Sequence, residues 1–208
     1  MPTSRRNFIR ISTAALGGVA ISARGNMNAA EGPMVISTWN FGLQANEAAG
    51  KILESGGRAL DAIEAGGRVP ESDPKNTTVG LGGAPDREGK VTLDACIMDE
   101  KGGCGSVVFL EDIEHPISVA RMVMEKTPHV MLAGEGARQF ALANGFPKRK
   151  LLTPESEAAY KEWLKNSKYK PVINIENHDT IGILAKDAAG NLSGGCTTSG
   201  MAYKMRGR

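Results

Sequence analysis

Three residue types that could act together in catalysis follow one another in the last fifth of the chain: His178, Asp179 and Thr180. A threonine hydroxyl becomes an effective nucleophile when a base takes its proton, and the threonine's own α-amino group, with a pKa of about 7.7–8.0, can be that base. This arrangement requires an N-terminal threonine, so the peptide bond between Asp179 and Thr180 would first have to break. The junction therefore suggests a nucleophile that self-cleavage exposes.

Breaking this bond has a simple chemical route. The Asp179 carboxylate could deprotonate the Thr180 hydroxyl, which would attack the Asp179 carbonyl carbon, and water would then hydrolyse the resulting ester. Taken alone, however, an Asp-Thr pair is common and is usually a turn residue before a strand. The surrounding sequence has to decide between a cleavage junction and an ordinary turn. His178 is expected to hold the geometry of the junction rather than to react.

The pattern of apolar residues predicts the elements that position this junction. Residues 180–186 and 192–198 read as two strands, and the Asp- and Gly-containing segment 187–191 joins them as a hairpin turn. Upstream we expect strands at residues 34–39, 91–98 and 106–110, a short apolar run at 130–133, helices at 44–53, 59–69, 116–126, 135–143 and 154–166, and a long loop at 71–90. Pro70 is expected to end the helix that precedes it. The mixture predicts an α/β fold.

Composition excludes several classes of protein. The 208 residues include 25 basic and 23 acidic side chains, and this balance argues against a nucleic-acid-binding protein. Three cysteines without a CxxC pair argue against a zinc site and against a disulfide-dense scaffold. Cys96 and Cys104 are close enough in sequence to pair in an oxidising compartment, and three free thiols, Cys196 included, are the alternative.

The first thirty residues have the pattern of a targeting signal and are not expected to be part of the folded domain. Arg5 and Arg6, followed by Phe8 and an apolar stretch at 11–23, resemble a twin-arginine export signal. A basic N-terminus that happens to precede small residues is the alternative. We therefore expect a signal peptide at residues 1–30 and a periplasmic location, with no membrane-spanning segment after it.

The sequence around the junction resembles one family closely. Residues 171–182 and 191–204, with residues 36–42 near the mature start and 82–95 in the middle, resemble the glycosylasparaginases, also called aspartylglucosaminidases, which are N-terminal-nucleophile hydrolases. The resemblance extends from about residue 34 to residue 208. The string Asn-His-Asp-Thr-Ile-Gly is highly specific within the wider asparaginase group.

The resemblance implies a fold, a reaction and a division of the chain. It implies an αββα sandwich in which residues 31–179 are the α-chain part and residues 180–208 begin the β-chain part. It implies hydrolysis of the amide that joins N-acetylglucosamine to an asparagine side chain. Action on free asparagine or on β-aspartyl peptides is the alternative within the same superfamily. The resemblance implies no metal or organic cofactor, a small glycosylated asparagine as substrate, and compatibility with a dimer of cleaved pairs.

The resemblance also assigns roles to individual residues. Thr180 matches the nucleophile, Asp179 the residue before the scissile bond, and Thr198 a hydroxyl that tunes the nucleophile. Trp39 matches a tryptophan that lines the substrate pocket. Arg208 matches the arginine that pairs with the substrate's α-carboxylate, a task that suits a bidentate guanidinium.

The chain departs from the family at its C-terminal end, since family members continue well beyond the position of Arg208. The further segment would carry the aspartate that binds the substrate's α-amino group and the threonine-glycine pair of the oxyanion hole. Loss of one oxyanion donor costs roughly 10²- to 10³-fold in rate. We therefore expect a C-terminally truncated sandwich with uncovered strand faces and poor activity in isolation, and an inactive fragment that lacks the oxyanion hole is the alternative.

Overall fold

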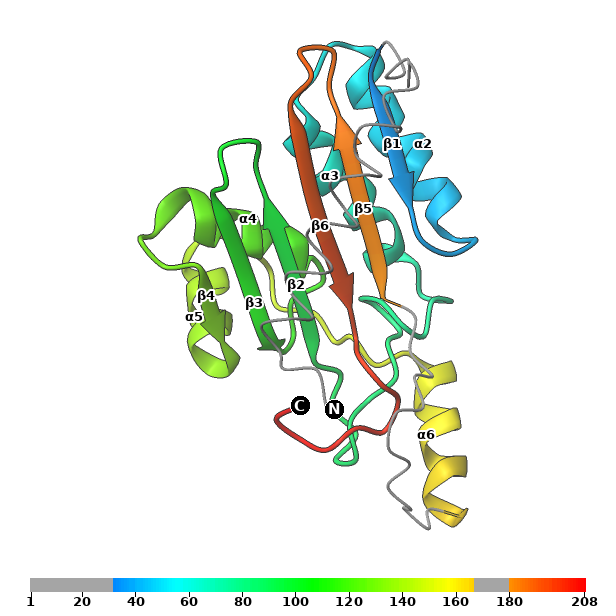
Figure 1. Cartoon of the computed structure of the whole chain (residues 1–208). Coiled ribbons are helices and arrows are strands. Elements are labelled where there is room, and N and C mark those ends of the chain that lie inside the picture. The colour runs from blue at the N-terminus through cyan, green and yellow to red at the C-terminus, as the bar shows by residue number, and fades with distance from the viewer. Residues whose placement is uncertain (1–31, 167–179) are drawn as a thin grey trace, which may run out of the picture. The chain divides into compact units, whose positions relative to one another are not determined.

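A six-stranded sheet runs through the part of the chain that this computed structural model describes, residues 32–166 and 180–208 (Figure 1). Its strands stand in the order β1-β5-β6-β2-β3-β4, and all neighbours are antiparallel except the parallel pair β3 and β4. The strands are β1 (Met34–Ser37), β2 (Leu93–Met98), β3 (Cys104–Leu110), β4 (Met131–Ala133), β5 (Ile181–Lys186) and β6 (Leu192–Thr198). The predicted export signal, together with His178 and Asp179, lies outside the described residues.

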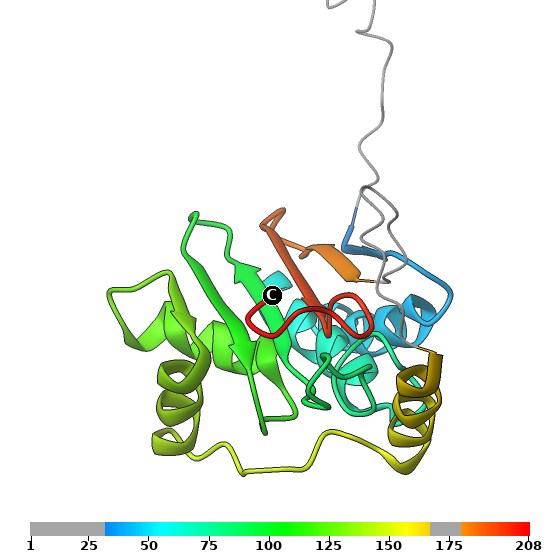
Figure 2. The same ribbon diagram turned by 90° about the horizontal axis from the view of Figure 1, so that it is seen from below.

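Helices cover one face of this sheet. Helices α2, α3 and α4 lie against the strands on the same side, as the view along the sheet shows (Figure 2). The helices are α2 (Gly42–Glu54), α3 (Ala59–Ser72), α4 (Pro116–Lys126), α5 (Gly134–Ala143) and α6 (Pro154–Asn166). Between residues 32 and 166 and between 180 and 208, no helix combines the length and apolar character needed to cross a bilayer.

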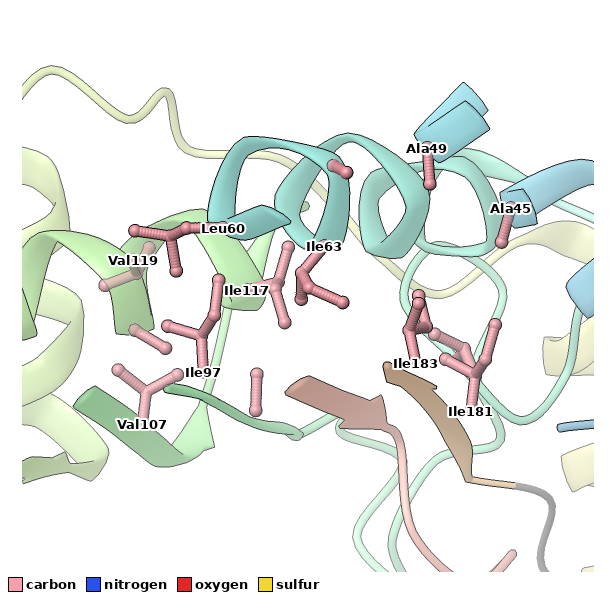
Figure 3. Close-up of a cluster of buried hydrophobic side chains, with 14 of the residues drawn as sticks. Ala45, Ala49, Leu60, Ile63, Ile97, Val107, Ile117, Val119, Ile181 and Ile183 are labelled. Atoms are coloured by element: carbon pink, nitrogen blue, oxygen red, sulfur yellow. The ribbon is translucent and has the colours of Figure 1, made fainter. Parts of the chain in front are cut away.

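The hydrophobic core lies between the helices and the strands that they cover. Every second strand residue points toward the helices, as the period of two along a strand requires, and meets aliphatic side chains of α2, α3 and α4 (Figure 3). The labelled members are Ala45, Ala49, Leu60, Ile63, Ile97, Val107, Ile117, Val119, Ile181 and Ile183. Each fully buried valine, leucine or isoleucine among them contributes about 1.5–3 kcal/mol to the free energy of folding.

Two adjacent glycines in α3 serve this core through their small size. A methyl group on Gly66 would lie 3.0 Å from the Ala45 carbonyl oxygen of α2, and one on Gly67 would lie 3.3 Å from the Ile117 side chain of α4. Glycine weakens a helix by about 1 kcal/mol relative to alanine. Here that cost allows α3 to approach both neighbouring helices closely.

The structure confirms most of the predicted elements and the α/β fold class. The hairpin of β5 and β6 and the helix that starts at Pro116 have the expected places. The prediction that Pro70 ends its helix is wrong, because α3 continues to Ser72. Pro70 removes a single backbone bond near the end of the helix, and Glu71, which follows it, is fully buried and accepts a hydrogen bond from the backbone N–H of Ile117.

The other face of the sheet carries no helix among the described residues. Six large apolar side chains on this open face are between 44% and 65% exposed. They are Met34, Ile36, Met98, Met131, Leu184 and Leu192. The described residues thus supply one helix layer and one sheet of the expected four layers.

Candidate active site

Thr180 lies directly before β5 and is held there by the turn that follows β1. Its carbonyl oxygen accepts two hydrogen bonds, from Thr38 Oγ1 at 3.1 Å and from Trp39 Nε1 at 3.0 Å. Thr38 Oγ1 also accepts a bond at 3.0 Å from the backbone N–H of Gly182, and the Thr38 N–H donates to the Gly182 carbonyl at 3.1 Å. Thr180 is therefore anchored through its C-terminal side, away from the bond to Asp179.

The register of the sheet brings Thr198 next to Thr180. Ile181 pairs with Thr197 across β5 and β6, so the next position pairs Thr180 with Thr198. Opposed residues in such a ladder have Cβ atoms about 4.5–5.5 Å apart. The Thr198 hydroxyl accepts a bond from the Gly200 N–H at 2.9 Å and lies 3.4 Å from the Thr78 carbonyl oxygen. Two of the predicted site residues therefore share one end of the sheet.

A carboxylate that the sequence analysis did not single out lies beside them. Asp94 of β2 pairs with Thr198 of β6, and strand alternation places both on the open face. The backbone N–H of Phe109 donates to Asp94 Oδ1 at 2.7 Å, at a bulge where Phe109 has a φ of +55°. Period-two alternation could have placed Asp94 on the face of Thr180, but its strand partner depends on a sheet order that sequence does not show.

Trp39 is well placed to line a site at Thr180. Its ring is 53% exposed, and its backbone has a φ of +66°, a left-handed conformation that costs a bulky residue energy. The hydrogen bond from its indole nitrogen to the Thr180 carbonyl helps to stabilise this conformation. An exposed indole with its polar edge satisfied can offer its apolar face to a ligand.

Arg208 lies in the segment that follows β6, and a buried lysine anchors that segment. Lys204 is 1% exposed, and its ammonium donates to the carbonyl oxygens of Thr92, at 3.1 Å, and of Ser199. Burial lowers the pKa of Lys204, the charge of Asp94 acts in the opposite direction, and the charge of Arg208 lowers it further. The hydrogen bonds of Lys204 fix the backbone of the segment that carries Arg208.

Arg206 holds the same segment, residues 199–208, through ion pairs. The Arg206 guanidinium forms ion pairs with the buried Asp86 at 3.1 Å, with Glu88 at 3.3 Å and with Glu111 at 2.6 Å. It also lies 5.1 Å from the centre of the Phe109 ring, within range of a cation–π contact. Lys204 and Arg206 thus hold the segment that carries Arg208. Neither could be recognised from spacing alone, because apart from Ser199 the hydrogen-bond partners of their side chains lie about 90 to 120 residues away.

A buried carboxyl group supports the site from the helix side. Glu71 accepts hydrogen bonds from Thr197 Oγ1 at 2.7 Å and from the Ile117 N–H at 3.0 Å, and His115 Nδ1 lies 3.2 Å from it. Burial raises the pKa of Glu71, and the bonds from His115, Thr197 and Ile117 partly offset that increase. Glu71 therefore ties α3 and α4 to β6 one residue before Thr198.

Comparison of the sequence with known protein families gives a match over most of the chain. A family model described as asparaginase matches residues 16–208. The chain belongs to this asparaginase family. No group of three or more histidine, cysteine, aspartate or glutamate side chains arranged to hold a metal ion occurs in the ranges 32–166 and 180–208.

Individual members of the family are similar over most of the chain. An N(4)-(β-N-acetylglucosaminyl)-L-asparaginase of Elizabethkingia miricola is 60% identical over 216 residues, which cover 100% of this chain and 64% of that protein. Proteins of the same name from rat and mouse are each 37% identical and are matched over 85% of this chain and 60% of their own length. The chain thus spans less than two thirds of the length of these asparaginase relatives.

Proposed function

We propose that this asparaginase-family chain forms the nucleophile-bearing part of a hydrolase that cuts the amide between N-acetylglucosamine and an asparagine side chain. The observation that carries the proposal is the anchoring of Thr180 by Thr38 and Trp39, with Thr198 in the next strand position. The names of the three relatives supply the substrate class.

Self-cleavage between Asp179 and Thr180 is the first step that we infer. The Thr180 hydroxyl attacks the Asp179 carbonyl carbon, the peptide nitrogen leaves as the free α-amino group of Thr180, and water hydrolyses the ester. The new amino group then acts as the base for the same hydroxyl. The bonds from Thr38 and Trp39 to the Thr180 carbonyl do not involve the broken peptide, so they would keep the new N-terminus in place.

The remaining site residues would then orient the substrate. Arg208 pairs with the α-carboxylate of the asparagine moiety, Trp39 lines the pocket, and Thr198 adjusts the environment of the Thr180 hydroxyl. Lys204 and Arg206 fix the backbone that leads to Arg208, which would reduce the entropy lost when this segment binds the substrate.

Mass spectrometry of the purified chain tests self-cleavage. We expect two fragments that divide between Asp179 and Thr180, and an intact chain for the Thr180→Ala variant. Cleavage at another bond, or equal cleavage of the variant, would contradict the assignment of the nucleophile.

Substrate ranking tests the reaction class. The cleaved protein is incubated with N4-(β-N-acetylglucosaminyl)-L-asparagine, with L-asparagine and with a β-aspartyl dipeptide, and the Thr180→Ala variant serves as the blank. We expect the glycosylated substrate to react fastest. The order of the three rates identifies the reaction class even if all three rates are low. A preference for either of the other two would assign the protein to the related activity of the superfamily.

We further propose export by the twin-arginine route and a dimer of cleaved pairs. Residues 1–30 fused to a folded reporter should direct it to the periplasm, and the double change Arg5→Lys and Arg6→Lys should retain it in the cytoplasm. Export of the double variant at the original rate would argue against this route. Light scattering of the cleaved protein measures the oligomeric state.

A further inference from the structure

Two cysteines face each other across the centre of the sheet. Cys96 of β2 pairs with Cys196 of β6, and their Sγ atoms lie 3.4 Å apart. Both are half-buried free thiols. They stand two positions from Asp94 and Thr198 respectively, on the open face that also carries Thr180.

The backbone already has the spacing that a disulfide requires. Directly opposed residues of antiparallel strands have Cα atoms about 4.5–5.5 Å apart, and disulfides join Cα atoms about 4.4–6.8 Å apart. Rotation of the two side chains can therefore bring the sulfurs to bonding distance without a movement of either strand. The third cysteine, Cys104, pairs with Met98 instead and does not face a thiol in this register.

The neighbouring strand leaves room for a reagent to reach the pair. The residue opposite Cys196 on β5 is Gly182, where an added Cβ would meet only Thr38 Cγ2, at 3.9 Å. On the other side, Cys96 faces the small side chain of Ser106. The two sulfurs are therefore flanked by a glycine and a serine rather than by large side chains.

The contact between the two thiols makes them unequal. A hydrogen bond from Cys196 lowers the pKa of Cys96 to about 6, and the same bond raises the pKa of Cys196. The charge of Asp94 also disfavours a thiolate at Cys196. The sulfur that accepts the hydrogen bond is therefore the more acidic thiol and the other is the less acidic one, and thiol–disulfide exchange begins from the more acidic member of such a pair.

We propose that Cys96 and Cys196 form a dithiol site that reacts with small disulfides and closes a cross-strand disulfide between β2 and β6. The Cys96 thiolate attacks one sulfur of the disulfide, a mixed disulfide forms at Cys96, and one thiolate leaves. Cys196 loses its proton to solvent and attacks the Cys96 sulfur, and the second thiolate leaves. Two cysteine thiols are oxidised and one disulfide is reduced to two thiols.

The bond would join the strands that carry Asp94 and Thr198. In an uncleaved chain the linked residues are 100 positions apart, so the cross-link would restrict the unfolded state strongly and raise the urea concentration at the midpoint of unfolding. In a chain cleaved between Asp179 and Thr180, the same bond would join the two fragments covalently. The site does not depend on the proposed hydrolase activity, and its chemistry is measured without a turnover assay.

Oxidation with glutathione disulfide tests the proposal. The reduced, folded chain is incubated with the reagent, the remaining thiols are alkylated, and the products are analysed by mass spectrometry before and after trypsin digestion. We expect the loss of two hydrogen atoms, with the two fragments joined wherever the chain is cleaved between Asp179 and Thr180. We also expect one alkylated cysteine, at Cys104, and a linked pair of peptides that contain Cys96 and Cys196. The Cys104→Ser control should oxidise at the same rate.

Single variants separate attack from resolution. Cys196→Ser should accumulate glutathione on Cys96, whereas Cys96→Ser should leave Cys196 unmodified over the same period. A link between Cys96 and Cys104, three alkylated cysteines in the wild-type chain after excess reagent, or equal glutathione uptake by the two variants would overturn the proposal. Circular dichroism before and after oxidation verifies that the folded chain reacts.

Discussion

The two faces of strands β5 and β6 differ in what their residues do, although their members alternate along the same backbone. Toward the helices point Ile181, Ile183 and Thr197, which are at most 2% exposed. Toward the open face point Thr180 and Thr198, together with Cys196, all half-buried. Neighbouring residues therefore differ in role: those on one face pack in the core, and those on the other are the residues to which the proposed function assigns chemistry.

This separation has a physical consequence for substitutions. A change on the helix-covered face alters burial and therefore the free energy of unfolding, whereas a change on the open face leaves the core in place. Glu71 is the link between the two, because it bonds Thr197 on the covered face one residue before Thr198. Variants at adjacent positions should thus produce opposite profiles of stability and chemistry.

The largest effect is expected at Thr180. Thr180→Ala should reduce self-cleavage on the order of 10⁶-fold, the scale on which removal of a protease nucleophile acts. Mass spectrometry over time measures the rate, and Thr180→Ser, which keeps a hydroxyl, is the matched control. Cleavage of the alanine variant at a measurable rate would place the nucleophile elsewhere.

The next effect compares two adjacent residues of β5. Ile183 is 2% exposed and Leu184 is 57% exposed. Ile183→Ala should lower the free energy of unfolding by about 2–5 kcal/mol, and Leu184→Ala should change it by about 0.5 kcal/mol or less. Urea denaturation followed by circular dichroism measures both, and equal losses would show that the open face is covered in solution.

A smaller effect compares the two neighbouring threonines of β6. Thr197→Val removes the hydroxyl bond to the buried Glu71, so it should cost about 1–3 kcal/mol of stability and leave self-cleavage close to wild type. Thr198→Val should do the reverse and slow self-cleavage about tenfold, equivalent to about 1.4 kcal/mol in the barrier. If both variants are less stable but both cleave at the wild-type rate, Thr198 has no role in tuning Thr180.

The smallest effect is the pH dependence that Glu71 contributes. Its pKa is raised in the folded state by burial, so its contribution to stability is complete below the ordinary value of 4.5 and is lost as pH rises through the folded value. The stability of the wild type relative to Glu71→Gln should therefore fall as pH increases above 4.5, by at most about 1.4 kcal/mol per pH unit. Urea midpoints at several pH values measure this difference, and a constant difference would show that burial does not raise the pKa.

Sequence patterns predicted the local elements well and the distant pairings poorly. The start of α4 at Pro116 and the β5–β6 hairpin follow from residues within a few positions of one another. The end of α3 did not follow, because Glu71 is held by Thr197 and Ile117, which are distant in sequence. The parallel pairing of β3 with β4 is likewise invisible in an apolar run of three or four residues.

Some residues of the candidate site were indicated by the sequence, and others were recognised only in the structure. The sequence indicated Thr180, Thr198, Trp39 and Arg208, and the structure brings the first three together through the β5–β6 register and the turn after β1. It did not indicate Asp94, whose place beside Thr198 depends on β2 being the neighbour of β6. For Arg208, the structure adds the anchors at Lys204 and Arg206.

The three cysteines show most directly what the sequence determined and what the tertiary structure determined. From sequence alone, Cys96 and Cys104 were the closest candidates for a pair, whereas the sheet order places Cys96 opposite Cys196. Alternation along a strand is a local property of the backbone, so the sequence by itself determined which residues share a face, and it indicated the junction at Thr180 as the candidate nucleophile. The order of strands depends on the packing of α2, α3 and α4 against them, so only the tertiary structure decided which of those residues meet.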